Sequence, residues 1–137
     1  MAVDEPADAE PREIHEGPAH YGSGTECSQQ MADIVAVAMW DVGAPDAAVE
    51  RMLGVVSRES GCDSAAYNGN TATGDDSFGL CQINRRSGWF SRGQLLSGVD
   101  PLRFAGDPTY NAEACATLYE RCGFGPWRYG NYGCARP

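Results

Sequence analysis

Three carboxylates occupy positions from which they could act on a glycosidic bond. Glu59 ends an apolar helical stretch, and Asp75 and Asp76 stand just ahead of the segment SFGLCQIN, residues 77–84. Cleavage of a glycosidic bond needs an acid that protonates the leaving oxygen, and many enzymes add a second carboxylate across the sugar ring. We therefore take Glu59, Asp75 and Asp76 as candidate catalytic residues.

Glu59 is the candidate for the acid. Met52, Val56 and Glu59 are spaced by four and three residues, so the carboxyl group continues an apolar helix face. Burial and the negative end of the helix dipole both disfavour the charged form. The position therefore predicts a raised pKa and a general acid near neutral pH. The alternative is a helix-end glutamate that meets water or pairs with an arginine.

The two aspartates follow Gly74 in a polar loop. A solvated carboxylate there stays ionised and could orient water or stabilise positive charge on a sugar ring. Aspartates also form turns in any glycine-rich loop, which is the competing interpretation.

Amide side chains near these acids are candidate sugar ligands. Gln82 and Asn84 alternate with Ile83, which predicts that both amides share one strand face. They could bind sugar hydroxyl and N-acetyl groups, or cap backbone groups. Asn111, four residues before Cys115, needs a partner on the inner face of its helix, either substrate or backbone. Aromatic residues that could stack on sugars or belong to the core are Tyr67, Trp89, Tyr110 and Trp127.

Helices must position these groups. We predict helices over residues 28–40, 46–60 and 108–122, because Ser28 and Asp107 can cap their starts and glycines follow two of their ends. Residues 62–76 read as a polar loop with room for a short hairpin, and residues 78–83 as a short strand. The fold class is α+β, mainly helical, with a small β element.

Composition divides the chain into two parts. Of 19 acids and 10 bases, seven acids and one base fall in residues 1–26, a net charge of −6. We expect residues 1–26 to be an acidic flexible leader and residues 27–137 to be one folded domain. No basic patch favours nucleic acid, and no apolar run reaches the length of a membrane span.

Six cysteines in so small a domain indicate disulfides and an oxidising compartment. Six cysteines allow 15 pairings, of which a Cys27–Cys134 bridge that ties the two ends together is an attractive one. Their spacing does not fit zinc knuckles, so we expect no metal.

Three separated blocks resemble a known superfamily. They are Ser57-Arg58-Glu59-Ser60, then Gly74-Asp75 with FGLCQIN (residues 78–84), and Tyr110-Asn111-Ala112. Together, over roughly residues 28–128, they are similar to soluble lytic transglycosylases and goose-type lysozymes of the lysozyme-like superfamily, in the variety found in phages and actinobacteria. The resemblance implies a lysozyme-like fold, with the β element beside an active-site cleft.

The resemblance also implies an activity. It is cleavage of the β-1,4 bond between N-acetylmuramic acid and N-acetylglucosamine in peptidoglycan, with Glu59 as the catalytic acid. Two departures leave the second carboxylate open: Asn84 stands where goose-type enzymes carry Asp, and Ser77 where chicken-type lysozymes do. The product is then either a 1,6-anhydro sugar or a hydrolysed end. The expected substrate-binding residues are Ser77, Gln82, Asn84, Tyr110, Asn111 and Trp127.

We expect peptidoglycan glycan strands as the partner of a monomer that is secreted or carried on a phage virion. No cofactor, metal, nucleic acid or membrane is expected. Two alternatives stay open: a non-catalytic glycan-binding or phage structural module of the same fold, and a chitin-cleaving relative.

Overall fold

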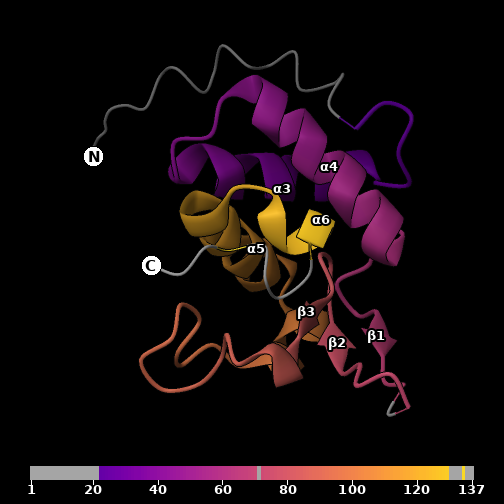
Figure 1. The fold of residues 1–137 in the computed structure, drawn as a ribbon. Helices are drawn as coiled ribbons and strands as arrows, with labels where there is room; N and C mark the ends of the chain where they lie inside the picture. Colours follow the sequence, from indigo (N-terminus) through magenta and orange to yellow (C-terminus); the bar gives the residue numbers. More distant parts are fainter. Residues whose placement is uncertain (1–21, 71, 130–133, 135–137) are drawn as a thin grey trace.

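A layer of helices lies above a small antiparallel sheet (Figure 1). This computed structural model describes residues 22–70, 72–129 and 134. Helices dominate and the strands are short, so the predicted class, mainly helical α+β, is confirmed. Most of the predicted leader lies outside the described residues.

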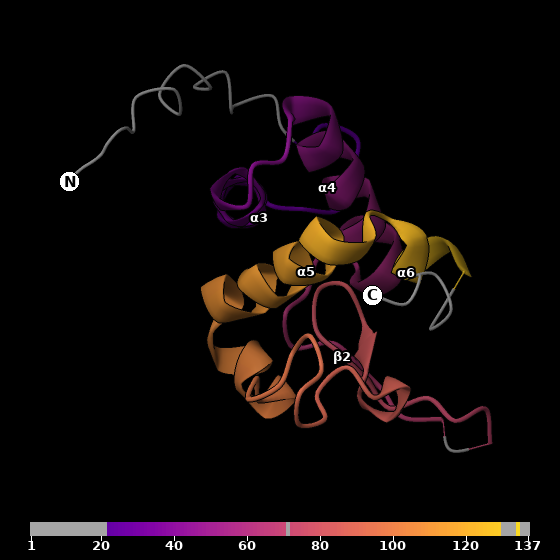
Figure 2. The same ribbon diagram turned by 60° about the vertical axis from the view of Figure 1, so that its left-hand side comes forward.

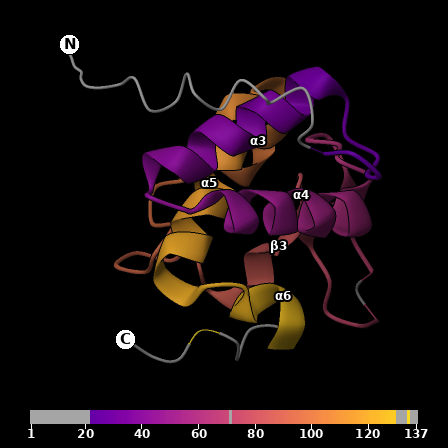
Figure 3. The ribbon, with the colours of Figure 1, turned by 90° about the horizontal axis from the view of Figure 1, so that it is seen from above.

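Three long helices carry most of the core. They are α3 (Gln29–Asp41), α4 (Asp46–Ser60) and α5 (Pro108–Cys122). α3 packs on both α4 and α5, and the view from above shows α3 crossing over α5 with α4 alongside (Figure 3). Their facing apolar side chains are buried, and the largest include Met39, Met52, Leu53 and Leu118.

Local chemistry sets the helix ends. The Ser28 hydroxyl accepts the backbone N–H of Met31, and the Asp107 carboxylate accepts that of Tyr110, both at 3.1 Å. These bonds satisfy N–H groups that the first helical turn leaves without a partner. α4 ends at Gly61, whose φ of 69° is a left-handed conformation that glycine adopts readily.

The sheet consists of three two-residue strands in the order β1 (Tyr67–Asn68), β2 (Ser77–Phe78) and β3 (Ile83–Asn84). The predicted strand over residues 78–83 is therefore wrong, because that segment is a hairpin. Gly79 and Gln82 have φ values of 80° and 52°, which reverse the chain between β2 and β3.

Shorter elements complete the described chain. The connection from β3 to α5 contains the 3-10 helices η2 (Arg85–Ser87) and η3 (Pro101–Gly106). The short helix α6 (Gly125–Tyr129) follows α5 and packs against it. Figure 2 shows that η2, η3 and the intervening loops lie on the same side of the helical layer as the sheet.

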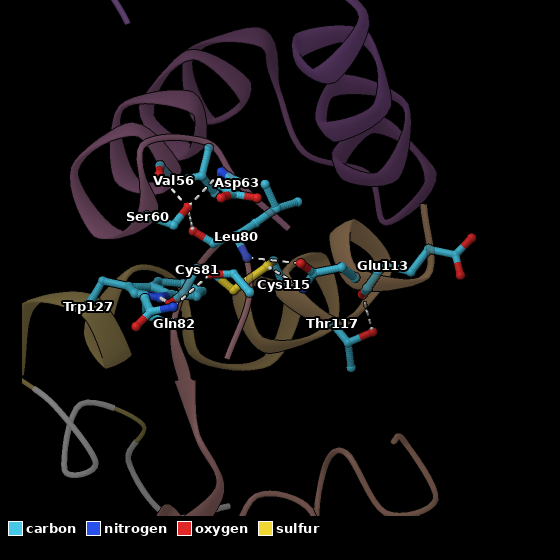
Figure 4. The surroundings of a disulfide bond; sticks show 12 residues. Val56, Ser60, Asp63, Leu80, Cys81, Gln82, Glu113, Cys115, Thr117 and Trp127 are labelled. Atoms are coloured by element: carbon cyan, nitrogen blue, oxygen red, sulfur yellow. Dashed lines mark hydrogen bonds between the residues drawn. A yellow bond between two sulfur atoms is a disulfide. The ribbon is translucent and has the colours of Figure 1, made fainter. Parts of the chain in front are cut away.

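Side chains from three helices each make a hydrogen bond to the buried turn between β2 and β3 (Figure 4). The Ser60 hydroxyl of α4 donates to the Leu80 carbonyl at 2.7 Å. The Asn111 side-chain oxygen of α5 accepts the Leu80 N–H at 2.9 Å. The Trp127 indole of α6 donates to the Cys81 carbonyl at 2.8 Å. Side chains thus satisfy backbone groups that the short sheet leaves unpaired.

Three disulfides confirm the predicted use of cysteine. The suggested bridge between Cys27 and Cys134 is wrong, because the chain reverses after α3 and brings the end of α4 back to the start of α3. There the Glu26 N–H donates to the Ser57 hydroxyl at 2.9 Å. The bridges join Cys27 to Cys62, Cys81 to Cys115, and Cys122 to Cys134.

Gly79 has no room for a side chain. A Cβ atom there would lie 2.5 Å from the Asn111 side-chain oxygen and 2.9 Å from the Phe104 ring. We expect Gly79→Ala to lower the free energy of unfolding by about 2–4 kcal/mol, because conformational strain and overpacking add. Gly93→Ala is the matched control, since Gly93 has a φ of 79° and nothing within 4 Å. Equal losses in chemical denaturation of the two variants would contradict the crowding.

The Cys81–Cys115 bridge should stabilise the fold more than the Cys122–Cys134 bridge does. It spans 34 residues, whereas the bridge from Cys122 to Cys134 spans 12. Loop-closure entropy then predicts a loss of about 2–5 kcal/mol for Cys81→Ala with Cys115→Ala, and about 1 kcal/mol less for the corresponding double variant of the shorter bridge. Denaturant titration of the two double variants measures this order.

Candidate active site

Glu59 lies in the last turn of α4 at the edge of an open pocket of about 370 Å³. Its side chain is 28% exposed. Met52 and Val56 are fully buried on the same helix face, so the carboxyl group continues the apolar stripe as predicted. The acid is therefore partly withdrawn from water yet open to a ligand.

Burial raises the pKa of Glu59 above its ordinary value. The Arg58 guanidinium, with a nitrogen 3.7 Å from the carboxylate, opposes this rise but does not cancel it. Arg58 is well exposed, so water screens its charge. The predicted direction of the shift is confirmed, and a raised pKa suits a general acid.

The pocket brings together most of the residues that the sequence nominated. They come from the end of α4, the loop before β2, the strands β2 and β3, the turn between those strands, and α6. Carboxylates, amides, a hydroxyl and an indole therefore face one space, which can hold a polar ligand with a ring. The nominated residues that line it are Glu59, Asp75, Ser77, Gln82, Asn84 and Trp127.

The two loop aspartates differ in position. Asp75 lines the pocket together with Glu59 and accepts a hydrogen bond from the Thr73 hydroxyl at 3.2 Å. Asp76 is buried and does not line the pocket. Its carboxylate accepts the Tyr67 hydroxyl at 2.6 Å and the Arg85 Nε–H at 2.8 Å. The structure thus places Asp76, nominated as catalytic, in the hydrogen bonds of the sheet and outside the pocket that holds Glu59 and Asp75.

The bonds to Asp76 also hold it ionised. The hydroxyl of Tyr67 and the guanidinium of Arg85 lower its pKa. Tyr67 belongs to β1, and Arg85 follows β3, so the carboxylate ties the two outer strands of the sheet together.

The amides line the pocket and also hold turns. The Gln82 side-chain N–H₂ donates to the Gly79 carbonyl at 3.0 Å, and the Asn84 side-chain oxygen accepts the Arg86 N–H at 2.9 Å. Gln82 lies in the turn rather than on a strand, so the prediction that both amides share a strand face is wrong. The sequence allowed two roles for these amides, backbone capping and sugar binding. The structure shows backbone capping, and both side chains also line the pocket, where a ligand could contact them.

Asn111 and Tyr110 do not line this pocket. Asn111 is fully buried, so it binds the Leu80 backbone and cannot reach a ligand. The Tyr110 hydroxyl accepts the Asp100 N–H at 2.8 Å, and the Arg103 guanidinium carbon lies 3.9 Å from the centre of its ring. The structure thus places both side chains, nominated as substrate-binding, in contacts that join α5 to neighbouring segments and not on the wall of this pocket.

Several residues that line the pocket are not among those that the sequence nominates as site residues. Asn68 pairs with Ser77 across β1 and β2, which brings its amide to the pocket. Only the exact register of that hairpin could have revealed it, because the loop before β2 carries few apolar residues to fix the register. Trp89, one of the candidate stacking residues, lines the pocket. The remaining lining residues are Ile83, Leu118 and Pro126.

No group of three histidine, cysteine, aspartate or glutamate side chains in the described part of the chain could hold a metal ion. Among the same residues, no helix has the length and apolar character to cross a membrane.

The chain matches no family model, no curated protein and no solved structure.

Burial of Glu59 predicts a pH-dependent stability. A glutamate whose folded-state pKa is raised contributes stability that is full below its unfolded value of 4.5 and is lost as the pH rises through the folded value. We expect Glu59→Gln to be at least as stable as the parent at neutral pH, and the parent to gain on it as the pH falls. Thermal melts across this range measure the difference.

Glu50→Gln is the control, because Glu50 is an exposed glutamate of the same helix. The stability difference between the parent and Glu59→Gln should change with pH more than the difference between the parent and Glu50→Gln. Equal changes would contradict a raised pKa for Glu59 in the folded protein.

Proposed function

We propose that this protein cleaves the β-1,4 glycosidic bond between N-acetylmuramic acid and N-acetylglucosamine in peptidoglycan. Glu59 is the general acid in this proposal. The observation that carries it is a half-buried carboxyl group with a raised pKa in a pocket that also holds a second carboxylate, amides and an indole. The three sequence blocks similar to lytic transglycosylases and goose-type lysozymes support the same chemistry.

The first step transfers a proton. Protonated Glu59 donates to the glycosidic oxygen, the bond to the anomeric carbon breaks, and positive charge develops on the sugar ring. Loss of this proton leaves Glu59 as a carboxylate, and the Arg58 guanidinium, with a nitrogen 3.7 Å from it, favours the ionised form. Trp127 supplies a flat apolar surface for a sugar face, since aromatic rings pack well on such faces.

The second step decides the product. If Glu59 takes the proton of the muramic acid 6-hydroxyl, that oxygen attacks the anomeric carbon and a 1,6-anhydro sugar forms. If Asp75 activates water on the opposite face, hydrolysis with inversion follows, which needs carboxyl groups about 6.5–9.5 Å apart. The position of Asp75 in the pocket favours testing hydrolysis with this residue and not with Asp76.

Three disulfides fit folding in an oxidising compartment. We therefore propose that the protein acts on the bacterial cell wall from outside the cell, either as a secreted protein or as part of a phage virion.

Mass spectrometry of muropeptides released from purified peptidoglycan tests this function. We expect the parent to release fragments and Glu59→Gln to release about 100-fold fewer or none, since positioned acids contribute about 10²–10⁴-fold. Fragments lighter by one water identify anhydro ends, and reducing muramic acid identifies hydrolysis. Asp75→Asn should abolish release only in the hydrolytic case.

Asp76→Asn is the structural comparison for Asp75→Asn, and it should lower stability more than it changes the product. An active Glu59→Gln protein would refute the assignment. Binding of glycan without cleavage by the parent would favour the non-catalytic module, and cleavage of chitin oligomers in preference to peptidoglycan would favour the chitin-cleaving alternative.

A further inference from the structure

A second pocket, of about 540 Å³, lies beside the first and is lined by three arginines. Arg51 and Arg58 lie seven residues apart on α4, which places them two turns apart on one helix face. Arg128 comes from α6. Three of the ten arginines thus converge in a chain whose net charge is −9, so this positive site stands out from an acidic protein.

One of the three arginines lies over an aromatic ring of the pocket. The Arg51 guanidinium carbon lies 4.4 Å from the centre of the Phe124 ring. Stacking occupies the face of a guanidinium and leaves the N–H groups at its edge directed outward. Those edges match the geometry of a carboxylate or phosphate, which two parallel N–H donors can bind together.

Gly54 forms part of the pocket wall in the middle of α4. Glycine is unfavourable at an interior helix position. A Cβ atom there would meet nothing within 4 Å, so packing does not require a glycine. The missing side chain keeps the space between the arginines open, as a binding site would need.

Trp127 lines both pockets, and Arg58 directly precedes Glu59. A polymer that lies across Glu59 would therefore place its substituents within reach of the arginines. Each N-acetylmuramic acid of peptidoglycan carries a peptide arm with carboxylates, whereas the glycan itself is neutral where that arm is attached.

We propose that the pocket of Arg51, Arg58 and Arg128 binds a carboxylate of the peptide arm of the glycan strand held at Glu59. This site rests on the proposed function and adds to it a preference for peptide-bearing strands. A phosphodiester of a wall-linked polymer shares the same oxyanion chemistry and is distinguished by the experiment.

Binding to strands measures this preference without requiring turnover. The full chain with Glu59→Gln is titrated with peptidoglycan strands that carry peptides and with strands stripped of peptides by an amidase. The lactyl carboxylate that the amidase exposes on each muramic acid is first converted to a neutral amide, so that the two strands differ in the peptide and its carboxylates. We expect about fivefold to tenfold tighter binding of the peptide-bearing strands, because charge-assisted hydrogen bonds supply the difference. The preference should shrink as salt is added, since exposed charges are screened.

Matched variants test the residues. Adding Arg51→Gln should bring the two affinities toward parity, while Arg92→Gln removes the same charge at an exposed position outside the pocket and should keep the preference. Gly54→Leu fills the pocket with a good helix former and should also reduce the preference, which guards against a folding defect in the arginine variant.

The outcomes separate the two claims. Equal affinities for both strands in the Glu59→Gln background, or a preference that survives Arg51→Gln and Gly54→Leu, would overturn the peptide site. A preference that follows removal of phosphodiester polymers from the wall, and not removal of peptides, would overturn the carboxylate source. Failure of the parent to cleave peptidoglycan would instead refute the proposed function and leave this binding readout intact.

Discussion

The buried turn between β2 and β3 depends on side chains of three helices for its backbone hydrogen bonds. Leu80 and Cys81 are fully buried, and a buried peptide group without a partner costs about 1–3 kcal/mol. Ser60, Asn111 and Trp127 supply the partners from α4, α5 and α6. The disulfide from Cys81 to α5 fixes the same turn covalently. Helical layer and sheet are therefore held in one relative arrangement.

The position of the candidate acid, Glu59, depends on the contact between the end of α4 and this turn. Glu59 immediately precedes Ser60, so the hydroxyl bond to Leu80 also fixes the end of α4. Trp127, held on the Cys81 carbonyl, forms a wall of the pocket. Gln82 closes the turn and lines the same space. Groups held by one hydrogen-bonded unit keep their spacing, which is what a site for proton transfer requires.

Local signals predicted the three long helices well, since Ser28, Asp107 and Gly61 act through bonds and conformations within a few residues. The apolar stripe leading to Glu59 likewise needed no tertiary information. The cysteine pairing, and the finding that Asp75 lines the pocket while Asp76 does not, could not be predicted in this way. They depend on which segments meet in space, and the short strands around the site carry too few alternating residues to reveal their register.

A crystal structure of the Glu59→Gln protein with a bound oligosaccharide of alternating N-acetylglucosamine and N-acetylmuramic acid tests the central claim most directly. The account predicts that a glycosidic oxygen lies within about 3.2 Å of the amide at position 59, the reach of a proton donor. It also predicts that one face of a sugar packs against Trp127. Asp75 should lie on the side of the cleaved sugar ring opposite position 59. A saccharide bound elsewhere, with position 59 facing only water, would contradict the assignment of Glu59 as the acid.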